Sequence, residues 1–165
     1  MKQTINKSWS RFIAVQVLFQ IDFNERMGLD ISEVFNERKI IKVIKNMHSL
    51  NKNIIVFEDV EYKIDSKWLI SLLKHVINNK KDLDINLSEN IDKSWSLGRM
   101  DGTLISILRC AYTEILCFNN IPTKVIISEY TNISASFFND KEVDFVNGIL
   151  DVLAQKFRSS EFIKK

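Results

Sequence analysis

The sequence predicts an all-α protein, a single-domain bundle of about six or seven helices. Apolar residues recur at intervals of three and four residues in several separate segments, which is the spacing of one face of an α-helix. The chain has one proline and four glycines among 165 residues, so strong helix breakers are few and long helices are favoured over many short strands. This length suits one domain with a sizeable core, and we expect residues 1–165 to form it.

The first half of the chain predicts two helices and a connecting loop. Residues 8–25 are mostly apolar with a narrow polar stripe, so this helix is expected to be central. A second helix is expected from Asp30, where Glu33 makes a capping-box-like start, to about Met47. Residues 48–58 are expected to form a loop. They include a possible short strand (NIIVF), but no partner strand is evident nearby.

A third helix is expected from about Asp59 to Asn78, and it should bury an apolar stripe made of Trp68, Leu69, Leu72, Leu73 and Val76. The polar stretch 78–96 predicts a turn, a short helix and another loop.

The clearest helical pattern in the chain begins at Met100. Apolar residues keep helical spacing from there for about five turns, to Phe118. Pro122 can open the next helix at its first turn, because its fixed backbone angle suits that position. The chain then breaks and restarts, with Asn139 or Asp140 as the cap of a last helix that reaches residue 158.

The last helix contains a local contradiction at Asn147-Gly148. This dipeptide is typical of a β-hairpin turn, yet the apolar residues around it keep helical spacing. A glycine inside a helix costs about 1 kcal/mol relative to alanine. We therefore expect Gly148 to let a neighbouring backbone or aromatic ring approach closely; the alternative is that it marks a kink.

Composition and cysteine spacing favour a cytoplasmic globular protein. Hydrophobic residues make up 45% of the chain and charged residues 27%, and no apolar run is long enough to span a membrane. The first residues lack the apolar core of a secretory signal. Cys110 and Cys117 lie seven positions apart on one expected helix, about 10 Å between α-carbons, which is too far for a disulfide. They are expected to be reduced core thiols.

The sequence offers no pattern for catalysis or metal binding. It has no phosphate-binding glycine loop, no nucleophile elbow, no HExxH and no CxxC, and His48 and His75 have no ligand spacing. The acidic residues Glu58, Asp59 and Glu61 are interpreted as the solvated start of a helix, where they complement its dipole. We expect neither enzymatic activity nor a cofactor nor a metal.

Charge is concentrated at the two ends of the chain. Residues 1–21 carry +3 without an acidic residue, and residues 156–165 also carry +3. Because the net charge is only +2, the residues between the ends sum to −4. Basic ends are compatible with solubilising termini and also with contact to a polyanion.

Three segments of the chain resemble the NusB transcription antitermination factors. They are residues 95–116 (WSLGRMDGTLISILRCAYTEIL), 121–130 (IPTKVIISEY) and 145–151 (FVNGILD). Residues 11–22 are similar to the first helix of that family, whereas residues 24–64 carry little resemblance. The resemblance implies an all-helical, non-catalytic protein that binds single-stranded boxA RNA in nascent ribosomal RNA transcripts. It also implies that the protein acts jointly with the ribosomal protein NusE, helping RNA polymerase and other Nus factors to read through terminators.

The resemblance also implies the site residues. The family's arginine-rich amino end corresponds here to a stretch with fewer arginines, and an aromatic residue and an amide precede the glycine of the last helix. The implied RNA-binding residues are Lys7, Trp9, Arg11, Phe145 and Asn147. A partner-docking surface is implied at the start of the helix after Met100, with Arg99, Asp101 and Leu104. Without the resemblance, Phe145 fits a core position as well, and Trp9 fits a staple of the first helix.

Two other functions remain open at this point. One is an RNA-binding accessory module like the NusB-like amino-terminal part of ribosomal RNA methyltransferases, although 165 residues leave no room for a cofactor-binding α/β domain. The other is a helical adaptor that binds protein alone.

Overall fold

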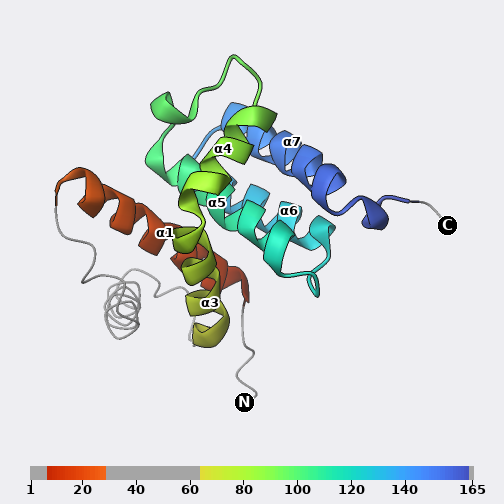
Figure 1. Cartoon of the computed structure of the whole chain (residues 1–165), viewed down its shortest axis with the longest axis horizontal. Helices are drawn as coiled ribbons and strands as arrows, with labels where there is room; N and C mark the ends of the chain where they lie inside the picture. The colour runs from red at the N-terminus through yellow and green to blue at the C-terminus, as the bar shows by residue number, and fades with distance from the viewer. Residues whose placement is uncertain (1–6, 29–63, 164–165) are drawn as a thin grey trace. The chain divides into compact units, whose positions relative to one another are not determined.

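The computed structural model describes residues 7–28 and 64–163, and within these ranges the chain is helical, without strands (Figure 1). The α-helices are α1 (Lys7–Arg26), α3 (Ser66–Asn78), α4 (Lys80–Asn90), α5 (Gly102–Cys117), α6 (Thr123–Ala135) and α7 (Asp140–Phe157). Two short 3₁₀ helices cover Leu97–Arg99 and Ser159–Glu161. The predicted all-α class is confirmed. The helix expected over 30–47, the loop expected over 48–58 and the acidic group 58–61 lie outside the described residues.

The chain divides into two compact parts, residues 1–71 and 72–165, with the boundary inside α3. Each part is described by itself. The expectation that residues 1–165 form a single domain stays a prediction.

In the first part, α1 has the buried character expected of it. It buries six apolar side chains: Ile13, Ala14, Val15, Val17, Leu18 and Ile21. The helix ends at Arg26, and Gly28 follows in the left-handed region, with φ of +72° and its N–H donating to the carbonyl of Glu25 at 3.0 Å. Glycine adopts this conformation at little steric cost, so it suits the end of a helix.

The helix expected from about residue 59 begins at Ser66 instead. Asp65 precedes it, and its Oδ1 accepts a hydrogen bond from the backbone N–H of Trp68 at 3.1 Å, which is the geometry of an N-cap. Residues 59–63 lie outside the described part of the chain. The predicted apolar stripe of this helix, from Trp68 to Val76, is buried as expected.

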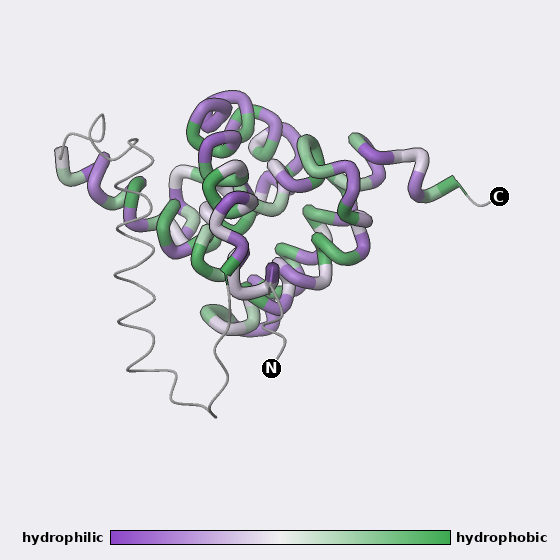
Figure 2. Tube along the Cα trace, turned by 90° about the horizontal axis from the view of Figure 1, so that it is seen from below, coloured by the Kyte–Doolittle hydropathy of each residue, from purple (hydrophilic) through white to green (hydrophobic). Residues whose placement is uncertain are grey.

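The second part is a packed group of helices. Helix α6 packs against α7, both pack against α5, and α4 contacts α5 and α7 (Figure 1). Apolar residues recur among polar ones along the helices (Figure 2), because each helix turns an apolar face to its neighbours. The largest fully buried side chains of this part include Leu87, Leu104, Ile107, Leu108, Tyr112, Ile115 and Tyr130.

Two polar contacts, one partly and one fully buried, tie helices of the second part together. Arg109, which is 6% exposed, donates from Nε and Nη2 to the two carboxylate oxygens of Asp84, each at 2.7 Å, and so links α5 to α4. The Tyr130 hydroxyl donates to Glu114 Oε1 at 2.8 Å between α6 and α5, where both side chains are fully buried. Each pair satisfies polar groups that would be costly to bury alone.

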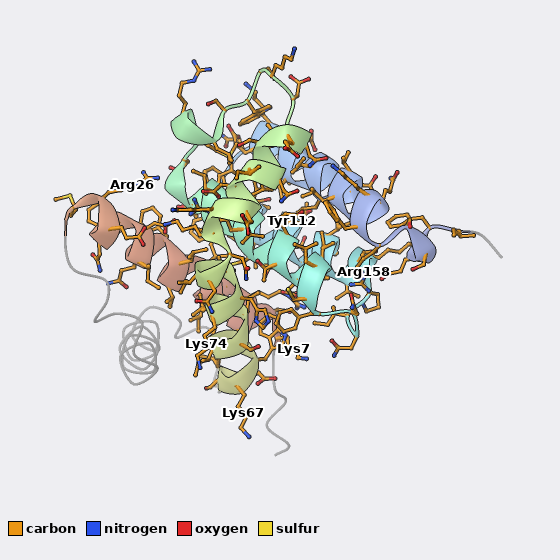
Figure 3. All side chains as sticks on the ribbon, in the orientation of Figure 1. Lys7, Arg26, Lys67, Lys74, Tyr112 and Arg158 are labelled. Atoms are coloured by element: carbon orange, nitrogen blue, oxygen red, sulfur yellow. The ribbon has the colours of Figure 1, made fainter. Side chains whose placement is uncertain are left out.

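The carboxyl-terminal 3₁₀ turn clamps the start of α6. Pro122 precedes this helix and provides no side-chain cap. Instead, Glu161 Oε2 accepts hydrogen bonds from the Thr123 backbone N–H and hydroxyl, both at 2.8 Å. Arg158 pairs with Glu161 and donates to the carbonyl of Ile121 at 2.8 Å (Figure 3). Burial acts to raise the pKa of Glu161, but the Thr123 hydrogen bonds and the Arg158 charge hold it below its ordinary value.

Three details differ from the sequence-based expectations. Helix α5 begins at Gly102 rather than Met100, because Asp101 Oδ1 accepts from the Thr103 N–H at 2.7 Å and caps the helix. Cys110 is a buried thiol as expected, whereas Cys117 is exposed. The close approach predicted at Gly148 is wrong.

Gly148 lies exposed in the middle of α7. A Cβ atom added there would meet no atom within 4 Å, and the helix is continuous from Asp140 to Phe157. No contact in the described structure explains the glycine.

Candidate nucleic-acid interface

The predicted amino-terminal RNA cations lie at the start of α1, against the indole ring of Trp68. The Lys7 Nζ lies 5.8 Å from the ring centroid and the Arg11 Cζ lies 5.2 Å from it. Lys7, labelled in Figure 3, is half-buried, whereas Arg11 is only 3% exposed. The helix expected over 8–25 left Lys7 just outside it, whereas α1 begins at Lys7, and nothing in the sequence indicated that Arg11 is covered.

Trp9, the predicted aromatic of this end, packs against its own helix. Its ring meets the edge of Phe12 with centroids 5.8 Å apart and planes at 81°. The neighbouring Ser10 accepts a hydrogen bond from the backbone N–H of Asp65 at 2.9 Å, which fixes the residues before α3 against α1. Trp9 is half-buried.

Phe145, the predicted aromatic of the last helix, stacks on another ring. Its centroid lies 4.0 Å from that of Trp95 and the ring planes differ by 18°, so the rings face each other. Both residues are half-buried, whereas the next residue along α7, Val146, is fully buried. Phe145 therefore lies at the margin of the core.

Trp95 is fixed by a turn before the 3₁₀ helix Leu97–Arg99. Asp92 Oδ1 accepts from the Ser94 N–H at 2.8 Å, and the Asp92 carbonyl accepts from the Trp95 N–H at 2.9 Å. The backbone hydrogen bond from Ser94 lowers the pKa of the Asp92 carboxyl from its ordinary value. Lys141 of α7 lies over the other member of the stack, with Nζ 5.5 Å from the Trp95 centroid.

Asn147 does not share the environment of Phe145. Residues two apart on an α-helix point to different sides, and Asn147 is exposed on the side of α6, where the Thr131 hydroxyl lies 3.5 Å from its Oδ1. Phe145 and Asn147, both predicted to bind RNA, therefore face different sides of α7.

The three predicted partner-docking residues line one cavity in the second part of the chain. Arg99 and Asp101 are exposed, and Leu104, only 2% exposed, contributes to the wall. The cavity has a volume of about 350 Å³, and Trp95 and Glu142 also line it. The side chain of Trp95 therefore belongs to two features at once, the stack on Phe145 and the wall of this cavity.

Trp95 and Lys141 lie beside Phe145 but were not among the site residues predicted from the sequence. Trp95 opens one of the segments that resemble NusB proteins, but a stack between residues far apart in sequence is a tertiary contact with no local pattern. The sequence does contain one signal for Lys141: it lies four residues before Phe145, and this spacing places the two side chains on one face of a helix.

Two further observations concern the described residues. They contain no group of three or more histidine, cysteine, aspartate or glutamate side chains arranged to hold a metal ion. Within the described ranges, no helix combines the length and the apolar character that a membrane span requires.

Known proteins resemble this chain in sequence and in fold. Residues 8–155 match the model of the NusB family. The chain is similar to the transcription antitermination protein NusB of Sinorhizobium medicae (strain WSM419), with 29% identity over 161 residues, covering 98% of this chain and 93% of that protein. It is 31% identical over 149 residues to the protein of the same name from Bartonella henselae, covering 90% of this chain and 87% of that one.

Among solved structures, that of T. maritima NusB has the same fold, with a TM-score of 0.71 and 24% sequence identity, covering 96% of this chain and 98% of that one. Because the family match extends over most of the sequence, the chain belongs to the NusB family.

Proposed function

We propose that this protein is a non-catalytic transcription antitermination factor. It binds boxA-type single-stranded RNA in nascent ribosomal RNA transcripts together with the ribosomal protein NusE. With other Nus factors, this complex promotes read-through by RNA polymerase in the cytoplasm. Membership of the NusB family supports the proposal, as do relatives that carry the name of transcription antitermination proteins.

The observation that carries the RNA-binding part is the placement of Phe145. A half-buried ring at the margin of the core, with Lys141 one turn earlier on the same helix face, offers both an aromatic surface and a cation. Single-stranded RNA is held by these two kinds of group, because bases stack on aromatic faces and phosphates attract lysine and arginine.

The amino end of α1 supplies the second group of proposed RNA contacts. Lys7 and Trp9 are half-buried and present a cation and an indole. Arg11 lies against Trp68 and is 3% exposed, so a phosphate contact by Arg11 requires its guanidinium to leave that ring. Asn147, exposed on a different side of α7 from Phe145, is proposed to contact the RNA separately.

The cavity at the start of α5 is the proposed docking place for NusE. Its exposed charges of opposite sign, Arg99 and Asp101, can pair with polar groups of a partner, while Leu104 forms an apolar wall. A cavity of about 350 Å³ is large enough to receive a protruding side chain.

Binding measurements separate this proposal from its two alternatives. We expect the chain with NusE to bind a labelled boxA-type RNA more tightly than a scrambled RNA of equal length. If the chain binds NusE but the pair binds neither RNA, it is a protein-binding adaptor. If the chain binds structured ribosomal RNA in preference to the boxA-type strand, it resembles the accessory module of a methyltransferase in function.

A further inference from the structure

We propose that Trp95 is a second base-contacting ring of the RNA site and that Lys141 contacts a phosphate beside it. The inference rests on the proposed function and extends it, since the aromatic surface offered to RNA becomes the pair Trp95–Phe145 rather than Phe145 alone.

The stack itself is the first reason. Because the rings lie 4.0 Å apart and differ by 18° in orientation, Trp95 covers one face of Phe145. A base that reaches this place therefore meets the two rings as one stacked unit. The indole is the larger aromatic surface of the two, and base–aromatic stacking tolerates any base because every base has a π-face.

The exposure and anchoring of Trp95 are the second reason. Trp95 is half-buried, so part of its indole is open to solvent. Its backbone N–H is bonded to the Asp92 carbonyl at 2.9 Å, and the Asp92 carboxylate holds the next turn through Ser94 at 2.8 Å. These hydrogen bonds fix the backbone and the stack on Phe145 holds the ring, so little conformational freedom is lost when a base stacks on it, which favours binding.

The position of Lys141 is the third reason. Its Nζ lies 5.5 Å from the Trp95 centroid, and it precedes Phe145 by one helical turn, so cation and stack share one side of α7. Asp140 and Glu142 flank it in sequence in the first turn of α7 and oppose a phosphate there. The amino end of the helix dipole acts in the other direction and favours an anion near Lys141.

Substitutions on α7 and at Trp95 test the proposal, with a fluorescent boxA-type RNA as the probe. Because Trp95 also lines the proposed docking cavity, NusE is present at a concentration that saturates each variant. Trp95→Leu should weaken RNA binding about 5- to 150-fold, the effect of losing one stacked base, and Trp95→Phe should restore most of it. Phe157→Leu is the matched control, because Phe157 is a partly exposed ring on the same helix with a lysine, Lys156, 5.4 Å from its centroid. It should leave RNA affinity unchanged.

The phosphate contact has its own readout. Lys141→Ala should reduce the slope of log affinity against log salt by about 0.7, the value for one phosphate of a single strand, and Lys156→Ala should not. Affinities are referred to the folded fraction, measured by urea unfolding of each variant.

The outcomes separate this inference from the proposed function. If the wild-type protein binds the RNA but Trp95→Leu binds it equally tightly per folded molecule, Trp95 is only a packing residue and the inference is overturned while the proposed function stands. If Lys141→Ala and Lys156→Ala change the salt slope equally, the phosphate contact at Lys141 is wrong. If the wild-type pair binds no RNA, both proposals fail.

Discussion

Replacement of Gly148 by alanine should stabilise the protein. The residue is exposed inside α7, and the added Cβ would meet no atom within 4 Å, so the substitution carries no steric cost. Alanine is better than glycine in a helix by about 0.8–1.0 kcal/mol, and we expect the free energy of unfolding to rise by that amount.

Two further variants sharpen this prediction. Gly148→Leu should also stabilise, by slightly less than alanine, because the space beside the backbone is open and leucine is a good helix former. Gln155→Ala is the control, because it introduces alanine at another exposed position of the same helix without removing a glycine. Its free energy of unfolding should stay within about 0.5 kcal/mol of that of the wild type.

Urea unfolding followed by circular dichroism is the assay. With a slope of about 1–3 kcal/mol per molar urea, a gain of about 1 kcal/mol moves the midpoint by roughly 0.3–1 M. The midpoint of Gly148→Ala should rise with the slope unchanged. A lower midpoint for alanine, and a still lower one for leucine, would show that α7 packs closely at this position and would refute the reasoning from the open space.

Three further predictions concern polar contacts. Asp84→Ala should destabilise the protein by about 2–3 kcal/mol in urea unfolding, because it leaves the Arg109 guanidinium buried without its carboxylate; a loss under 0.5 kcal/mol would show that water replaces the pair. Glu161→Gln should cost about 1 kcal/mol at neutral pH, because the amide oxygen can still accept from Thr123 but the charge that strengthens this hydrogen bond and faces Arg158 is lost. Because folding lowers the pKa of Glu161, its contribution to the free energy of unfolding is present above the ordinary pKa of 4.5 and is lost as the pH falls through the lower folded pKa. The difference in stability between Glu161→Gln and the wild type should therefore vanish in acid. A difference that does not depend on pH would contradict this cause. With so few cations, the wild-type slope of log affinity against log salt should correspond to about two to four phosphate contacts. Lys7→Ala should weaken RNA binding and make this slope shallower; an unchanged affinity and slope would show that Lys7 is not part of the site.

The helices were predictable where apolar residues keep helical spacing over several turns. The pattern after Met100 and the one around Gly148 both gave helices in the expected places, because burial of one face every three to four residues requires no tertiary information. The starts were less predictable. Asp101 and Asp65 each cap a helix later than the apolar pattern suggested, because a side chain that bonds the first backbone N–H groups decides where the helix begins.

The candidate site was predictable only in part. Phe145 could be predicted from the resemblance, and the structure shows it half-buried rather than fully buried. The burial of Arg11 against Trp68 and the stack of Trp95 on Phe145 could not, because both depend on residues that are distant in sequence and that no periodicity relates. The expected role of Gly148 failed for a related reason: the sequence shows the helical cost of a glycine but not whether a neighbour is present.

The RNA affinity of Phe145→Ala, measured with NusE present, tests the central claim most directly. We expect boxA-type RNA to bind the variant about 1–3 kcal/mol more weakly than it binds the wild type, because the half-buried ring stacks on a base rather than filling the core. Urea unfolding should show that the variant is still folded. A variant that loses stability but keeps its RNA affinity per folded molecule would contradict the account and make Phe145 a core residue.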